Sequence, residues 1–243
     1  FSLSRGLGDV YKRQLLHSTS KYAVKNFEFS KNPLAIDIGS NDGTLLEGFK
    51  KQGFKVLGVE PTNIAKLANK KGVKTIQKFF DTKTAQYIRK RFQKAEVITG
   101  TNIFAHINKL DSLMKGVKSL INIKNGIFVT ESHYAVNILD EMQFDSIYHE
   151  HLRFYLLKPL IYLLNKYGFK VIDASRIPNY AGSIRVTATL NKNIKPKTNV
   201  KKIIDQEKKR GFYSEKKYKQ YAKKVISVRK NLSEMLWKLK LKR

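Results

Sequence analysis

Apolar residues recur along this chain in short runs that alternate with amphipathic stretches. The short runs predict buried strands, and the stretches with apolar residues three and four apart predict helices. We expect strands at 34–38, 55–60, 73–77, 95–101, 126–132, 169–177 and 182–190. We expect helices at 44–53, 63–72, 81–93, 110–121 and 158–168.

The connections between these elements indicate how the strands are arranged. The first five strands alternate with helices, which predicts right-handed βαβ units and a parallel sheet with helices on both faces. The last two strands are joined only by PNYA at 178–181, which is too short for a helical crossover. These two strands should therefore be antiparallel. The predicted fold class is α/β, a Rossmann-like, mostly parallel sheet with an antiparallel last strand and a basic helical tail.

The chain divides into three predicted parts. Residues 1–14, FSLSRGLGDVYKRQ, do not lead into the pattern that follows, and we expect a non-native leader there. Residues 15–190 form the predicted α/β domain. Residues 191–243 form a basic extension of one or two helices, with 19 Lys and Arg against 4 Asp and Glu.

Composition limits the classes of protein that this chain can belong to. The net charge of +29 fits either a lysine-biased proteome or a polyanionic partner. We do not expect nucleic acid as a partner, because the basic residues follow no recognisable binding motif. The absence of cysteine excludes disulfides and thiolate metal sites. The sequence also lacks an apolar stretch long enough to span a membrane, so we expect a cytoplasmic protein without membrane contact.

The turn after the first strand, IDIGSNDGTLL at 36–46, carries candidate binding chemistry. Gly39 and Gly43 let the backbone turn tightly and approach a ligand, at the edge where open α/β sheets bind ligands. The same turn contains three side chains with acceptor oxygens: Asp37, Asn41 and Asp42. Carboxylates repel a pyrophosphate but suit a cationic sulfonium, and Glu60 after the second strand can accept ribose hydroxyls.

This turn, together with Glu60, resembles the S-adenosylmethionine site of class I methyltransferases. An unrelated turn with a helix-capping Asp is the alternative. The resemblance implies that S-adenosylmethionine is the cofactor and that it is bound by Asp37, Gly39, Ser40, Asn41, Asp42, Gly43, Glu60, Pro61 and Asn102.

Five segments in this order and spacing resemble the sugar C-methyltransferases: DIGSNDGTLL, VLGVEPTNIA, TNIFAHI, FDSIYHEHLRFY and RIPNYAGSIRV. Members of this family place a methyl group on a ring carbon of a nucleotide-linked 4-keto-deoxysugar. The resemblance covers about 33–240 and implies a nucleotide-sugar substrate, and we expect a monomer. It also implies substrate contacts from Asn179, Tyr180, Ser183 and Arg185.

The stretch YHEH at 148–151 allows three interpretations from its residues alone. A metal site would use His149 and His151, with His106 or His133 as a third ligand. A structural role has the histidines hydrogen-bonded in a polar rim, and we favour it for His149. An acid–base site would remove a proton from the carbon beside a ketone. That reaction needs a base with a pKa near neutrality and a group that stabilises the enolate oxygen.

The family resemblance assigns roles within this stretch. His151 is the predicted base, and Glu150 orients it or binds a sugar hydroxyl. Tyr148 and His106 donate hydrogen bonds to the enolate or to the 4-keto oxygen. No metal is needed for this step, and we expect none.

The chain also departs from the family pattern. Tyr180 and Ala181 stand where a histidine and a glycine are usual, and His133 stands where proline is favoured. The family carries an N-terminal zinc module and a second α/β domain, so we expect this chain to be a fragment. The alternative functions are another class I methyltransferase, acting on a small molecule or RNA, and a non-catalytic basic binding module that has kept the fold.

Overall fold

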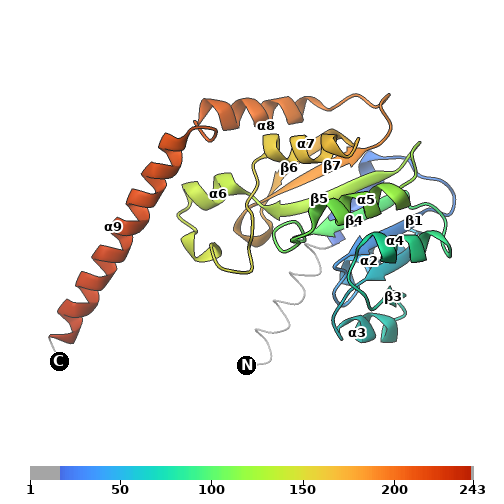
Figure 1. The fold of residues 1–243 in the computed structure, drawn as a ribbon, viewed down its shortest axis with the longest axis horizontal. Helices are drawn as coiled ribbons and strands as arrows, with labels where there is room; N and C mark the ends of the chain where they lie inside the picture. Colours follow the sequence, from blue (N-terminus) through green and yellow to red (C-terminus); the bar gives the residue numbers. More distant parts are fainter. Residues whose placement is uncertain (1–16, 242–243) are drawn as a thin grey trace.

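The fold is described by a computed structural model that covers residues 17–241. Its sheet consists of β1 (Leu34–Ile38), β2 (Lys55–Val59), β3 (Thr75–Ile76), β4 (Val97–Thr101), β5 (Ile127–His133), β6 (Lys170–Ile177) and β7 (Ser183–Thr189). Figure 1 shows the sheet and the helices around it. The order across the sheet is β3-β2-β1-β4-β5-β7-β6. β7 is antiparallel to β5 and β6, and the other pairs are parallel. The predicted α/β class, a mostly parallel Rossmann-like sheet whose last strand is antiparallel, is confirmed.

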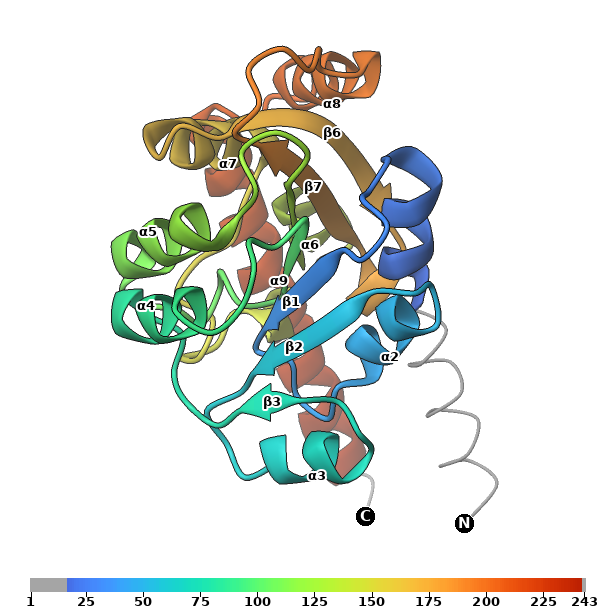
Figure 2. The same cartoon turned by 90° about the vertical axis from the view of Figure 1, so that its right-hand side faces the viewer.

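Helices cover both faces of the sheet (Figure 2). One face is covered by α4 (Thr82–Arg89), α5 (Leu110–Leu120) and α7 (Leu157–Lys166). The other is covered by α2 (Thr44–Lys50) and the helical residues 17–26. The short helices α3 (Ala65–Lys70) and α6 (Ala135–Asp140) lie beside β3 and after β5.

The central strand β1 shows why the sheet is buried on both sides. Leu34, Ile36 and Ile38 join the larger apolar core, while Ala35 joins the smaller core on the opposite face. Successive side chains of a strand point to opposite faces, so a strand with helices on both sides is apolar at nearly every position. The polar exception is Asp37, which is also buried.

Two helical segments were not among the predicted elements. Half of residues 17–26 are Ser, Thr or Lys and few are apolar, so the helical period of this segment is weak. α6 has six residues, fewer than the window over which helical periodicity can be recognised. The predicted leader at 1–14 lies outside the described residues.

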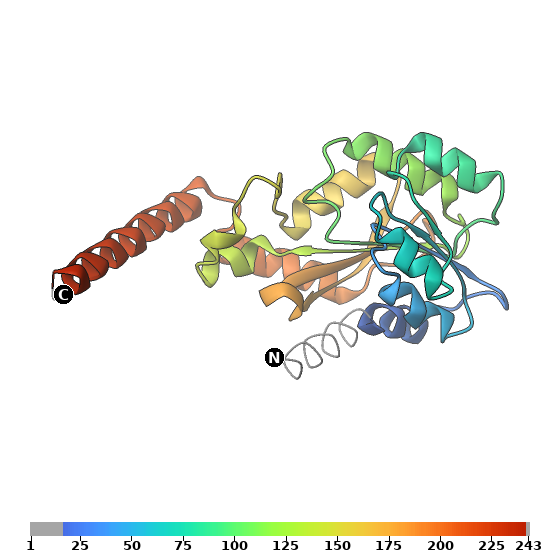
Figure 3. The same cartoon turned by 90° about the horizontal axis from the view of Figure 1, so that it is seen from below.

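The predicted basic extension at 191–243 contains two helices with different surroundings. α8 (Thr198–Lys209) packs along β6, and Val200 and Ile203 join the larger core. α9 (Glu215–Lys240), every residue of which the structure describes, has no buried residue and projects from the body (Figures 1 and 3). Trp237 lies on this arm and is 61% exposed. Within residues 17–241, no helix is both long and apolar enough to cross a membrane.

Candidate active site

A cavity of about 830 Å³ opens at the carboxyl ends of β1, β2 and β4. Every predicted cofactor residue except Gly43 lines it, and so does the predicted catalytic residue His106. These lining residues are Asp37, Gly39, Ser40, Asn41, Asp42, Glu60, Pro61, Asn102 and His106. The sheet therefore brings the turn after β1 and Glu60 after β2 to the same cavity.

The glycines of the first turn allow the close packing that the sequence predicts. Gly39 has a φ of +72° and Gly43 a φ of +81°, both in the left-handed region. A Cβ atom on Gly39 would lie 2.9 Å from the side chain of Ile103, which lines the same cavity. The backbone at Gly39 thus approaches the Ile103 side chain more closely than a larger residue would allow.

Asp37 is the most strongly perturbed acid of the cavity. Its Oδ1 accepts a hydrogen bond of 2.6 Å from the Thr99 hydroxyl. Burial, and to a lesser extent the negative charges of Glu131 and Glu60, raise the pKa of Asp37 to about 7 against the lowering effect of the Thr99 bond. A cationic ligand would favour its ionised form.

Glu60 and Asp42 differ in how many hydrogen-bond acceptor positions of the carboxylate remain available to a ligand. Glu60 Oε1 accepts from the Thr62 amide at 2.9 Å and hydroxyl at 2.6 Å, and Oε2 accepts from the Asn41 amide at 3.1 Å. One acceptor position of Oε2 remains for a ligand hydroxyl. The Asp42 carboxylate accepts from Thr44 and pairs with Lys71 at 2.8 Å. Its cofactor role remains a prediction, because these contacts also fit the alternative of a helix cap.

The YHEH stretch follows a short 3₁₀ turn, η1 (Phe144–Ser146). Within this stretch, the His151 ring has hydrogen-bond contacts at both of its nitrogens. His151 Nδ1 lies 2.9 Å from the Ser146 carbonyl oxygen, and Nε2 lies 3.3 Å from the Tyr148 hydroxyl. A carbonyl oxygen only accepts, so Nδ1 is the protonated nitrogen that donates to it. In the neutral tautomer the Nε2 lone pair then faces the Tyr148 hydroxyl, which can donate to it. A role as base requires this lone pair to take a proton from the substrate instead.

Two histidines from other segments lie beside this ring. The centroid of His151 lies 4.9 Å from that of His106 and 5.3 Å from that of His133. Burial lowers the pKa of His133, and the charged forms of His151 and His106 lower it further. Across residues 17–241, no group of three or more His, Asp or Glu is arranged to hold a metal ion.

The other two residues of the stretch are exposed. His149 stacks edge-on against Tyr148 at 5.9 Å between ring centroids, which fits the structural role favoured for it. Glu150 is exposed, whereas the group that holds His151 Nδ1 is the Ser146 carbonyl. The predicted orienting role of Glu150 is therefore filled by backbone in this structure, and its predicted contact with a sugar hydroxyl stays a prediction.

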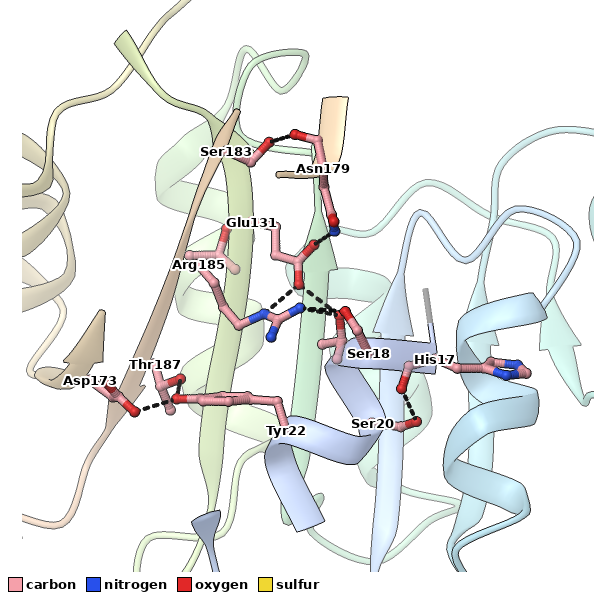
Figure 4. A network of polar contacts seen from close by, with 12 residues as sticks. His17, Ser18, Ser20, Tyr22, Glu131, Asp173, Asn179, Ser183, Arg185 and Thr187 are labelled. Atoms are coloured by element: carbon pink, nitrogen blue, oxygen red, sulfur yellow. Dashed lines mark hydrogen bonds and ion pairs between the residues drawn. The ribbon is translucent and has the colours of Figure 1, made fainter. Parts of the chain in front are cut away.

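Asn179, Ser183 and Arg185, three of the four predicted substrate residues, lie in a buried polar network around Glu131 (Figure 4). Asn179 Nδ2 donates to Glu131 at 3.3 Å, Arg185 Nε donates to Glu131 at 2.7 Å, and the Ser183 hydroxyl donates to the Asn179 carbonyl at 2.9 Å. None of these three predicted residues is among the described residues that line the cavity. The side chain of Tyr180 lies outside the described part of the structure. In this conformation the three side chains bind other parts of the protein.

A family model described as "Methyltransferase domain" matches residues 11–174. The chain belongs to the methyltransferase domain family. A second model, described as "C-methyltransferase C-terminal domain", matches residues 178–243.

Known proteins similar to this methyltransferase domain fall into two groups. C-methyltransferase NovU from Streptomyces niveus is 31% identical over 217 residues, which cover 88% of this chain and 51% of NovU. The chain thus spans about half the length of this relative. Magnesium protoporphyrin IX methyltransferase from Synechocystis, solved with bound SAH, shares the fold at 14% identity with a TM-score of 0.55, covering 74% of this chain and 83% of that one. A chain of the complex with the Haloferax volcanii Trm112 methyltransferase activator gives a TM-score of 0.59 at 11% identity, covering 77% and 95%.

Some residues at the site of the methyltransferase domain were missed by the sequence reasoning. Phe79, Phe80, Asp81, Lys109 and Ser112 also line the cavity. The signal for the first three was their place after the third strand, at the same sheet edge as the cofactor turn. Thr19 joins the polar network from residues 17–26, where no helix was predicted.

Proposed function

We propose that this chain is the cofactor-binding part of an S-adenosylmethionine-dependent C-methyltransferase that acts on a nucleotide-linked 4-keto-deoxysugar. The observation that carries this proposal is the placement of His151. Its Nδ1 is held by the Ser146 carbonyl and its ring lies 4.9 Å from that of His106, which lines a cavity with the buried carboxylates of Asp37 and Glu60. Similarity to NovU, itself a C-methyltransferase, supports methylation at carbon.

The residues of the cavity fit S-adenosylmethionine. Asp37 supplies negative charge for a cation, Glu60 has acceptor capacity for a ribose hydroxyl, and Gly39 allows close backbone approach. A magnesium protoporphyrin methyltransferase of the same fold was solved with bound SAH, which supports this choice of cofactor. When bound, S-adenosylmethionine supplies an electrophilic methyl group on a positively charged sulfur.

The chain's own residues then have to make a sugar carbon nucleophilic. Nε2 of His151 takes the proton from the carbon beside the ketone, while Nδ1 keeps its bond to the Ser146 carbonyl. The electron pair left on that carbon delocalises onto the ketone oxygen as an enolate. Tyr148 and His106 lie next to His151 and are the donors proposed to stabilise that oxygen.

The test is a titration of the purified chain with S-adenosylmethionine, followed by incubation with a thymidine diphosphate 4-keto-deoxysugar. We expect saturable cofactor binding and a sugar product that carries one additional methyl group on carbon, identified by mass spectrometry and NMR. A chain that binds no S-adenosylmethionine would contradict the proposal. A chain that binds it and methylates only RNA or another small molecule would move the assignment to a different methyltransferase class.

A further inference from the structure

Glu131 is a buried acid on β5 that receives hydrogen bonds from three separate segments (Figure 4). It is 2% exposed. Its carboxylate accepts from the Thr19 hydroxyl at 2.6 Å, from Arg185 Nε at 2.7 Å and from Asn179 Nδ2 at 3.3 Å. These donors come from the helical residues 17–26, from β7, and from the 3₁₀ turn η2 (Asn179–Ala181). One carboxylate therefore joins the N-terminal helix to the turn that carries a predicted substrate residue.

The backbone of Glu131 reaches the other side of the site. Its carbonyl accepts from the backbone amide of Asn102 at 2.8 Å. Asn102 lines the cofactor cavity and has a φ of +57°, an uncommon conformation that needs support from its surroundings. Glu131 thus contacts both the cofactor side and the substrate side of the proposed active site.

We propose that Glu131 is a positioning residue, which fixes the turn at Asn179 relative to the cofactor cavity through its carboxylate and its carbonyl. The inference rests on the proposed function, because it concerns the geometry of that same site. A functional side chain keeps its productive geometry only when neighbouring residues restrict it. Asn179 is restricted in this way, since its side chain binds Glu131 and its carbonyl binds Ser183.

The negative charge of Glu131 also affects the pKa of Asp37, which lines the cavity. Glu131 and Glu60 are the two acids whose negative charges raise the pKa of Asp37, which bonds to the neutral hydroxyl of Thr99. Replacing Glu131 by glutamine removes one of these charges, so Asp37 should stay ionised to lower pH. Binding of a cation should then persist to lower pH as well.

The test compares Glu131→Gln with Tyr22→Phe. The Tyr22 hydroxyl anchors the same helical residues 17–26, donating to Asp173 at 2.7 Å and lying 2.9 Å from the Thr187 hydroxyl, without touching Asn179. Both variants remove polar contacts of this helix, and only the first removes the contact with the turn. The double variant Glu131→Gln/Arg185→Gln avoids leaving Arg185 as an unpaired buried charge, in case the single variant fails to fold.

We expect Glu131→Gln to lower kcat for the keto sugar at least about tenfold while leaving S-adenosylmethionine affinity at pH 8 within about threefold. The double variant also lacks Arg185, a predicted substrate contact, so it is compared by hydrogen exchange and not by kcat. The loss of affinity towards acidic pH should begin at lower pH than in the wild type. Tyr22→Phe should keep wild-type kcat and lower only the thermal midpoint. Equal kcat values for folded Glu131→Gln and Tyr22→Phe would overturn the positioning role.

A measurement without ligand separates this inference from the proposed function. Amide hydrogen exchange of the free protein should be at least about tenfold faster at 178–183 in the Glu131 variants, and unchanged there in Tyr22→Phe. Wild-type protein without methyltransferase activity would refute the proposed function and leave this readout intact. Unchanged exchange at 178–183 in the Glu131 variants would refute the positioning role, whatever the activity.

Discussion

His151 is the residue whose replacement should separate catalysis from cofactor binding. Its ring contacts Tyr148 and His106 but does not itself line the described cavity. We expect His151→Asn to lower kcat by about 10²- to 10⁴-fold, the usual contribution of a positioned base. S-adenosylmethionine affinity, measured by calorimetry, should stay within about twofold.

The matched control for this prediction is two residues away. His149 is exposed and contacts the Tyr148 ring, so His149→Asn should leave kcat within about threefold of the wild type. Near-normal turnover by His151→Asn on a 4-keto sugar nucleotide would show that another group is the base.

Asp37 should make cofactor binding depend on pH. Its pKa in the folded protein is raised to about 7, so the carboxyl loses its charge as the pH falls below neutrality. We expect the Kd for S-adenosylmethionine to rise as the pH falls from 8 to 6, approaching about tenfold per unit at the acidic end. In Asp37→Asn the affinity should be weak and nearly independent of pH. A flat wild-type profile would contradict this account.

The same carboxyl should lower folding stability at high pH. An acid with a raised pKa binds its proton more tightly in the folded state, so stability is lost as the pH rises from the unfolded pKa through about 7. We expect Asp37→Asn to raise the thermal midpoint at pH 8 and to have little effect at pH 4, measured by circular dichroism. An equal shift at both pH values would indicate a packing effect in place of a charge effect.

At the level of elements, the turn between β1 and α2 should tolerate no side chain at Gly39. Gly39 and Gly53 have similar positive φ values of +72° and +85°, but a Cβ on Gly53 meets nothing within 4 Å. Both alanine variants should lose about 1–2 kcal/mol of folding stability from backbone strain. Only Gly39→Ala, with its contact to Ile103, should also weaken S-adenosylmethionine binding. Equal S-adenosylmethionine affinity of the two variants would show that the close approach of Gly39 to Ile103 does not matter for binding.

The sequence alone was sufficient to predict features that depend on residues close together in the chain. Strands with continuous apolar runs were predicted to within a few residues, and Asp37 and Glu60 follow directly from strand ends on the same sheet edge. The roles of Asn179 and Arg185 were harder to predict. Their partner Glu131 lies 48 and 54 residues away, and Arg185 also binds Thr19 at a separation of 166 residues. No periodicity or motif spacing encodes such pairings.

The whole molecule divides into a packed body and an arm. α9 has no buried residue and is linked to the body through contacts near its start, such as Lys217 with Asp140 at 3.6 Å. We expect a chain that ends at Ser214 to keep its S-adenosylmethionine affinity within about twofold and its thermal midpoint within about 3 °C. A large loss of either would show that the arm stabilises the body.

The position of Trp237 has a practical consequence for spectroscopy. It is the single tryptophan of the sequence, and it lies near the C-terminal end of α9. This helix projects from the body (Figure 1). Intrinsic tryptophan emission therefore reports the local solvent around the arm and remains almost silent when the sheet melts. A denaturation curve recorded by tryptophan emission would describe the wrong part of the protein, whereas tyrosine absorbance would mainly follow the body.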